Sequence, residues 1–423
     1  MRNAAFFSLP ALAVLIPLLP AQGEQPERPI RFTTFPVADS EPVDPAAATA
    51  QGLQVLLQLA EGEDAEQWPY EGVYREDGGK LPVGYRVGGT SIACLAMIAA
   101  PGLSDDAARQ QALHKGVAFV LRTLDHPRMT IDFQGGYDVR GWGHIYALTL
   151  FLHLQGHGLV PKDLHDAVRD KTAWLVQALC ESAIPESGGW NYSRRPGYRS
   201  PRSQASTFMT APALQALFQA KARGHEVADA VLDQALDALE RARSAPGGYA
   251  YGAPRTSQND VEADDLGMMD RVGGSAARAT AVETTLLLAG RGDRERHRRA
   301  VHRFFEFWDD LAVRKSQRGT HIEPYGIAPY YFLFGHVYAA QAIELLADEG
   351  ERDALRAKMR AYLARSRDAD GSWNDRHFDR SAAYGTAMAI LALQMPNLPA
   401  PVARPASVAQ AEAGSKSPPP ADK

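Results

Sequence analysis

The chain has 423 residues, of which 45% are hydrophobic, and a formal net charge of −5. A charge this mild, with no basic stripe, excludes nucleic acid as an expected partner. Cys94 and Cys180 are too few for a disulfide framework, and neither a Cys-x-x-Cys nor a His-Glu-x-x-His motif is present. We therefore expect no metal site and no cofactor.

The N-terminal residues have the pattern of a cleaved signal peptide. A short basic start precedes an apolar run over residues 4–19, and the small residues Ala21 and Gly23 follow it. The pattern predicts a signal peptide over 1–23 and an N-terminal extension over 24–43. No later stretch is long enough to span a bilayer. We therefore expect an exported protein of the periplasm, cell envelope or medium, without a transmembrane anchor.

The elements that follow alternate between two kinds of helix. Residues 107–124 carry a single apolar stripe, which is typical of a helix on the outside of a fold. A glycine-aromatic loop comes next, and residues 142–155 are then apolar on nearly every side, which is typical of a buried helix. The stripe consists of Leu113, Val117, Val120, Leu121 and Leu124. This unit predicts an outer helix, a turn and an inner helix.

The same unit recurs along the chain. Outer helices are predicted near 46–60, 107–124, 163–182, 226–243, 294–312 and 350–367, and inner helices near 89–100, 142–155, 207–222, 275–289, 333–347 and 382–394. Hairpins with one apolar face are unstable alone, but six of them in two concentric layers close on themselves. We predict an all-α fold, an (α/α)6 toroid over residues 44–395. Its central cavity should lie at one end, lined by the inner helices and the loops leading into them.

Two segments resemble a known repeat motif. Residues 358–363 followed by Asp370-Gly371-Ser372-Trp373, and residues 171–175 followed by Gly188-Gly189-Trp190, are similar to the repeats of squalene cyclases and of protein prenyltransferase β subunits. Arg367 stands where that motif usually has glutamine. Weaker copies extend the resemblance to the α/α toroid superfamily of terpenoid cyclases over nearly the whole chain after residue 23. The resemblance implies the same toroid fold.

The residues disfavour one chemistry of that superfamily and offer a partial match to another. Zinc-dependent prenyl transfer needs an Asp-x-Cys that this chain lacks, which disfavours it. The cyclase motif Asp-x-Asp-Asp is similar to Glu262-Ala263-Asp264-Asp265, and the resemblance implies a proton donor at Asp264 beside Asp265. Because this run lies in a long polar loop, a solvated acidic segment is the favoured interpretation.

Polar and aromatic residues near the starts of inner helices are the candidate cavity lining. They are Trp142, His144, Arg278, Glu283, Tyr331 and His336. Arg278 and Glu283 lie on a mostly apolar helix, so they either find partners across the ring or face the cavity.

A Gly-His-aliphatic-Tyr string opens both the second and the fifth inner helix, at residues 143–146 and 335–338. Three repeats are half of a six-repeat ring, so we expect His144 and His336 to face each other across the cavity mouth and to contact a ligand. The tyrosine of each string is expected to pack between hairpins. The alternative is that each histidine only satisfies a neighbouring loop.

The function predicted from these features is that of an exported toroid that binds a glycan, lipid or peptide in its cavity, without evident catalysis. The alternatives are an acid catalyst of terpene-cyclase type and a glycan lyase or hydrolase that uses His and Tyr. Because Cys94 and Cys180 fall in different repeats and layers, we expect them not to pair. Residues 396–423, rich in Pro and Ala, are predicted to be a disordered tail.

Overall fold

The computed structural model describes residues 43–406, except 73, 134–138, 186, 192–203, 245–246, 255–265, 317–322, 324, 329–330 and 376–377. The unit Met1–Arg31 separates from the unit Phe32–Lys423 and lies outside the described residues. The predicted signal peptide and N-terminal extension therefore stay predictions. Only the last residue of that extension, residue 43, is among the described residues. Within the described residues the regular elements are all helical.

The helices fall into an inner and an outer set. The inner set is α2 (Val83–Ala99), α4 (Arg140–His157), α6 (Thr207–Ala222), α8 (Val272–Leu288), α11 (Tyr331–Glu344) and α13 (Ser381–Gln394). The outer set is α1 (Pro45–Gln58), α3 (Ala107–Thr123), α5 (His165–Ser182), α7 (Asp229–Arg241), α9 (Arg294–Glu306), α10 (Trp308–Ser316) and α12 (Glu349–Ser366).

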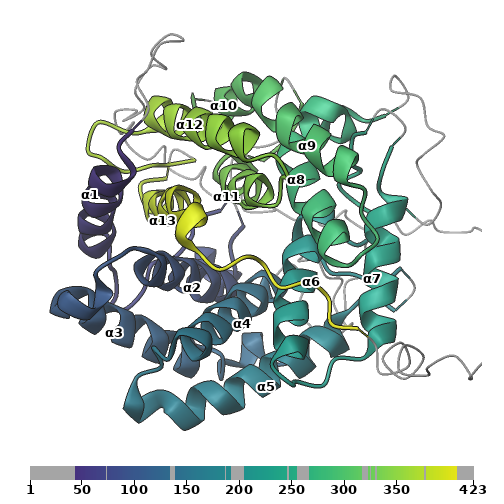
Figure 1. Ribbon diagram of the computed structural model, residues 1–423. Coiled ribbons are helices and arrows are strands. Elements are labelled where there is room, and N and C mark those ends of the chain that lie inside the picture. The colour runs from purple at the N-terminus through teal and green to yellow at the C-terminus, as the bar shows by residue number, and fades with distance from the viewer. Residues whose placement is uncertain are drawn as a thin grey trace, which may run out of the picture. The chain divides into compact units, whose positions relative to one another are not determined.

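The inner helices form a closed ring. Each packs on the next along the chain, and α13 packs on α2, which joins the last inner helix to the first (Figure 1). Nearly every side of these helices is buried, as in α8, where fifteen of the seventeen residues are buried. The predicted (α/α)6 toroid is confirmed.

Five of the outer helices pack mainly on the inner helix that precedes them. Thus α3 lies on α2, α5 on α4, α7 on α6, α9 on α8 and α12 on α11. The first helix of the chain, α1, packs on the last inner helix, α13. The outer layer therefore closes the ring by bringing residues 45–58 against residues 381–394.

Aspartate caps begin several outer helices. The side chains of Asp106, Asp293 and Asp348 accept hydrogen bonds from the backbone N–H three residues later, at 2.9, 2.8 and 2.6 Å. Asp44 does the same for Ala47 at 3.0 Å. Such caps satisfy backbone donors that have no partner within the helix, which fixes where each helix starts.

The loop tryptophans join one outer helix to the following inner helix. The indole Nε1 of Trp68, Trp190 and Trp373 donates to the carbonyl of Leu56, Leu179 and Leu363, and the backbone N–H of the same residues donates to the hydroxyls of Thr90, Thr210 and Thr386. The three rings are at most 1% exposed. Each of these three buried tryptophans therefore hydrogen-bonds to both helices of its hairpin and stabilises the turn between them.

Two helices differ from their predicted bounds by more than three residues. The fifth outer helix breaks at Phe307, whose ring lies against Gly273 on α8, so it forms α9 and α10. Helix α2 starts at Val83, before the predicted residue 89. Gly88 and Gly89 in this helix are needed because a side chain there would collide with the Trp142 ring and with the backbone of residues 68–70.

After α13 the chain crosses the ring. In Figure 1 the yellow segment runs from α13 toward α7. We call residues 398–406 the C-terminal strap. It is held by Arg404, whose backbone N–H donates to Leu288 at 2.9 Å and whose guanidinium pairs with Asp229 and Asp233 of α7 at 3.1 and 2.6 Å. This anchoring differs from the disordered tail predicted from residue 396. Residues 407–423 lie outside the described residues.

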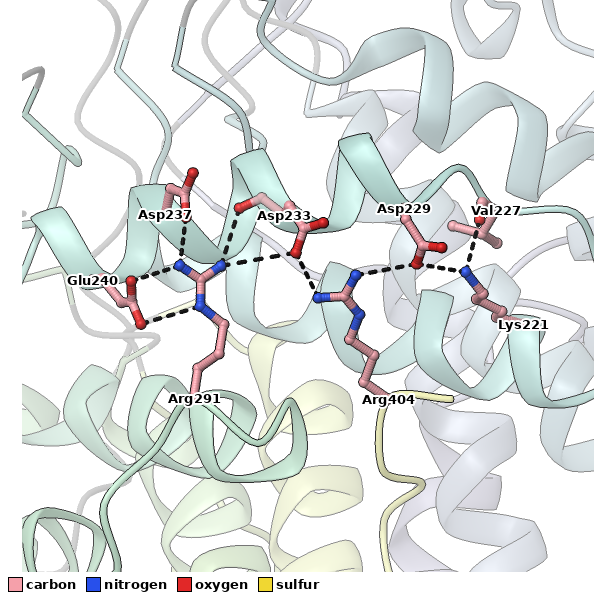
Figure 2. A network of polar contacts seen from close by, with 8 residues as sticks. All are labelled: Lys221, Val227, Asp229, Asp233, Asp237, Glu240, Arg291 and Arg404. Carbon is pink, nitrogen blue, oxygen red and sulfur yellow. Dashed lines mark hydrogen bonds and ion pairs between the residues drawn. The ribbon is translucent and has the colours of Figure 1, made fainter. Parts of the chain in front are cut away.

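The strap binds to an acidic face of α7. Figure 2 shows Arg291 and Arg404 side by side along Asp229, Asp233, Asp237 and Glu240. Arg291 reaches Asp237 at 2.5 Å and Glu240 at 2.7 Å. Carboxylates spaced one turn apart on a helix repel each other, so the strap arginine relieves a repulsion that α7 has by itself.

Both cysteines are free, as predicted, and Cys94 is buried. None of the helices in the described ranges has the length and apolar character needed to cross a membrane.

Candidate functional site in the ring

Aromatic side chains fill the ring toward the N-terminal ends of the inner helices. On one side Trp142 lies 5.8 Å from Tyr70, 5.9 Å from Tyr85, 5.1 Å from Tyr146 and 6.3 Å from Tyr384, measured between ring centroids. Two of these contacts are edge-on, an arrangement that aromatic rings prefer, and two are tilted. The predicted lining residue Trp142 thus lies at the centre of an aromatic cluster and is only 5% exposed.

A second aromatic group lies on α6 and α11. Tyr331 packs edge-on against Phe208 at 5.2 Å, and Phe334 packs against Tyr338 at 4.4 Å. The guanidinium of Arg278 lies 5.3 Å from the Tyr331 ring centroid. Arg278 donates to the carbonyls of Tyr249 and Met269 at 2.9 and 2.8 Å. The predicted residues Tyr331 and Arg278 therefore belong to the packed interior, 2% and 1% exposed.

Tyr146 and Tyr338 connect the two aromatic groups. Their hydroxyl groups influence each other's ionisation, and burial raises the pKa of both phenols. These are the tyrosines of the two Gly-His-aliphatic-Tyr strings. The two strings thus lie across the ring from each other as predicted, but the residues that come together are their tyrosines and not their histidines. The prediction that these tyrosines pack between hairpins is wrong, because both line the ring cavity.

The ring cavity has a volume of about 390 Å³ and lies on the C-terminal side of this tyrosine pair. Its walls come from the later turns of α4, α6, α11 and α13, and strap residues 398–402 form a further wall. This differs from the predicted cavity among the loops that lead into the inner helices. The apolar wall consists of Leu95, Pro212, Ala216, Val337, Met388, Leu391, Met395 and residues 398–402 of the strap.

Polar groups occupy one side of the cavity. His153 and His157 of α4 stack with their ring centroids 6.0 Å apart, and Arg223 at the end of α6 lies beside them. Burial, with further effects of His157 and Arg223, lowers the pKa of His153 to about 4. His153 is therefore neutral at pH 7. Across the cavity, the buried Oε1 of Gln341 accepts no hydrogen bond from the described residues.

The histidines of the two strings face the outer layer and do not line the ring cavity. The Nε2 of His144 lies 2.9 Å from the carbonyl oxygen of Met129, and its ring packs edge-on against Trp174. Trp308 donates its Nε1–H to His336 at 2.8 Å, so the Nδ1–H of His336 donates to Phe332 at 2.7 Å. Burial lowers the pKa of His336 to about 4. This arrangement matches the alternative in which each histidine satisfies its neighbours.

Glu283 also faces outward. Its Oε1 accepts a hydrogen bond from the Tyr249 hydroxyl at 2.5 Å and lies 3.4 Å from Arg243. Arg296 of α9 is 3.8 Å away. Glu283 is 3% exposed and is not part of the cavity lining. Of the two options for this residue, the structure shows the one in which it finds partners.

The predicted catalytic residues Asp264 and Asp265 lie outside the described residues. A different carboxylate is buried near the aromatic cluster. Asp375 is 0% exposed, and its charge acts on Tyr384 and on Lys315. Lys315 pairs with Asp368 at 2.6 Å, and burial raises the pKa of Asp368 and lowers that of Lys315. This is a group of buried ionisable residues of the kind found at functional sites.

The cavity residues missed by sequence reasoning had only weak signals. His153 and His157 are four residues apart, a spacing that places both on one helix face. Arg223 gave no signal, because its place beside α4 depends on how α6 packs in the ring. The strap gave no sequence signal for a place in the cavity wall either, since its composition is that of a disordered segment.

Comparisons with known proteins support the fold. Neither a family model nor a curated protein matches the chain. Among solved structures, the Lin0763 protein from Listeria innocua is 14% identical, with a TM-score of 0.51 over 84% of this chain and 97% of that one. D-mannose isomerase is 12% identical, with a TM-score of 0.50 over 88% and 100%. The type II terpene cyclase MstE from Scytonema is 15% identical, with a TM-score of 0.47 over 84% and 98%. At these identities the two likenesses with TM-scores of 0.51 and 0.50 show an α/α toroid fold alone.

Proposed function

We propose that this protein binds an apolar small molecule, such as a lipid, in the ring cavity under the C-terminal strap. The observation that carries the proposal is the cavity itself, about 390 Å³ in volume and walled largely by apolar side chains. Small-molecule sites are concave, mostly apolar and roughly 300–1,000 Å³ in size, with a few polar groups that orient the ligand. A glycan fits less well, because its many hydroxyl groups need more hydrogen-bond partners than this lining offers.

Filling the cavity tests this proposal. Ala216 lies in the cavity wall on α6, so Ala216→Trp places an indole in the space a ligand would take. Val337→Phe does the same from the opposite wall on α11. Ala354→Trp on the exposed face of α12 is the matched control. Dodecanol displacing a neutral solvatochromic dye reports the affinity of each variant.

We expect both cavity variants to bind dodecanol at least tenfold more weakly than the parent protein, and the control to bind as the parent does. Melting curves of the variants separate loss of binding from loss of folding. Parent-like affinity in both folded cavity variants would show that the ligand binds elsewhere.

Export after signal-peptide cleavage is part of the proposal. It rests on the apolar run and the small residues of the first 23 positions. N-terminal sequencing of the protein recovered from a bacterial host should start near Glu24 if the proposal is right. A protein retained in the cytoplasm with Met1 or Arg2 at its start would contradict it.

Acid catalysis is a second candidate function, favoured by one observation. Asp375 is a fully buried carboxyl whose charge acts on Tyr384 of the aromatic cluster. A buried acid beside aromatic faces suits protonation of an alkene, because the rings stabilise the cation that forms. Asp375→Asn should abolish conversion of isoprenoid alkenes followed by mass spectrometry, while Asp370→Asn, an exposed neighbour, should not. Absence of conversion in the parent protein would exclude this candidate.

A further inference from the structure

Arg223 supplies the charge on the described cavity wall. The described lining also contains the imidazoles of His153 and His157, but no aspartate or glutamate. Elsewhere on this side of the ring, arginines are paired with carboxylates, as Arg291 and Arg404 are on α7 (Figure 2). An arginine placed at an apolar cavity without a carboxylate is suited to a negatively charged group from outside the chain.

The guanidinium of Arg223 lies against α4 at the edge of the cavity. A Cβ atom at Gly156 would lie 2.0 Å from the guanidinium Nη2 of Arg223, so the glycine makes room for this side chain. Arg223 is exposed, and no described carboxylate pairs with it. Its N–H donors are therefore open to a ligand at the edge of the cavity.

The histidine pair supplies further donors at the same place. His153 and His157 are stacked one helical turn apart, and both line the cavity with Arg223. The effects of Arg223 and His157 on His153 show that the three groups lie within electrostatic range. One guanidinium and two imidazoles offer several hydrogen-bond donors to the oxygens of an anion.

A structural role for Arg223 is the competing explanation. It caps the C-terminal end of α6 and lies against the last turn of α4, where a cation stabilises the negative end of the helix dipole. That role concerns folding stability and does not depend on a ligand. Affinities for ligands that differ only in their head group separate the two roles.

We propose that the cavity ligand is an amphipathic anion, whose apolar chain occupies the ring cavity and whose carboxylate or phosphate binds Arg223, with hydrogen bonds from His153 and His157. This inference rests on the proposed function, because it assigns the head group of the ligand that the cavity binds. A carboxylate and a phosphate share the same chemistry, namely charged oxygens that accept from a guanidinium.

The test compares dodecanoate, dodecyl phosphate and dodecanol as probes of one chain length. They displace the same neutral dye from the parent protein, from Arg223→Gln and from Arg299→Gln, a control that removes an exposed arginine of α9. We expect the parent to bind the better of the two anions about tenfold more tightly than dodecanol, as charge-assisted hydrogen bonds predict. Arg223→Gln should lose that preference and keep the affinity for dodecanol, and Arg299→Gln should keep both.

The outcomes are distinct. Equal binding of both anions and dodecanol by the parent, or an anion preference that survives in Arg223→Gln, would overturn the inference and leave the cavity proposal standing. Failure of all three probes to bind the folded parent would overturn the proposed function as well. The ratio between dodecanoate and dodecyl phosphate identifies which head group the site prefers.

Discussion

At the scale of single residues, His336 is a histidine used as a buried, neutral hydrogen-bond bridge. It accepts from Trp308 of α10 and donates to Phe332 in its own helix, and it is 0% exposed. Protonation would remove the acceptor that Trp308 needs and would bury an uncompensated charge. Folding therefore depends on the neutral form.

This bridge predicts a pH dependence of stability. The pKa of His336 is about 4 in the folded protein and near 6.5 when exposed, so the unfolded chain binds more protons between these values. Stability from this group is complete above about pH 6.5 and is lost as the pH falls toward 4, by at most about 3 kcal/mol.

His336→Gln should lower the melting temperature at pH 7 and flatten its fall between pH 6.5 and 4. His302→Gln, an exposed histidine of α9, is the control. Ligand affinity of His336→Gln at pH 7 should equal that of the parent, because the side chain faces the outer layer. An unchanged pH profile in this variant would show that His336 is not the buried bridge described.

The tyrosine pair makes a second prediction at this scale. Tyr146→Phe and Tyr338→Phe each remove one hydroxyl from an interaction that spans the ring. Each should reduce the free energy of unfolding by about 1 kcal/mol, and the double variant should cost less than the sum, since one interaction is lost in both cases. Urea unfolding of the four proteins measures this coupling, and strictly additive losses would mean that the hydroxyls do not interact.

At the scale of elements, the strap and α7 are coupled through charge. Four carboxylates follow one face of α7, and the arginines that neutralise them come from the loop after α8 and from the strap. Exposed ion pairs contribute little to global stability, commonly less than about 1 kcal/mol. Here the ion pairs instead fix the position of the strap, which is a short apolar segment.

Arg404→Ala should therefore release the strap while the ring stays folded. The backbone amide of Arg404, which donates to Leu288 in the parent, should exchange its hydrogen faster, and so should the amides of the neighbouring strap residues. Arg356→Ala, which breaks a pair with Glu344 at another part of the ring, should leave strap exchange unchanged. Strap protection that persists in Arg404→Ala would mean that the ion pairs do not hold it.

The helices were predictable because their signal is local. An apolar stripe or an all-round apolar run lies within a single segment, and twelve of the thirteen described helices match predicted elements, with α10 formed by the break at Phe307. The candidate site was harder to predict from the sequence, because residues 144 and 146 lie about 200° apart on a helix. The pattern thus says that one faces inward and the other outward, but only the packed ring shows that the tyrosine faces inward.

At the scale of the whole ring, closure brings the groups of the candidate site together. The contact of α13 with α2 closes the ring, so that residues of α2, α4, α6, α11 and α13 line one cavity. Arg223 and Gly156 meet only because α6 packs against α4. A function carried by such a site depends on the closed ring and is invisible in any one repeat.

The most direct measurement for this account is a crystal structure of the protein with dodecanoate that carries bromine on its terminal carbon. The anomalous signal of bromine locates the chain end without ambiguity. We predict a bromine peak inside the ring cavity near Leu95 and Met388, with the carboxylate beside Arg223 and the strap in place above it. A bromine peak only outside the ring, with the cavity unchanged, would contradict the claim that this cavity is the ligand site.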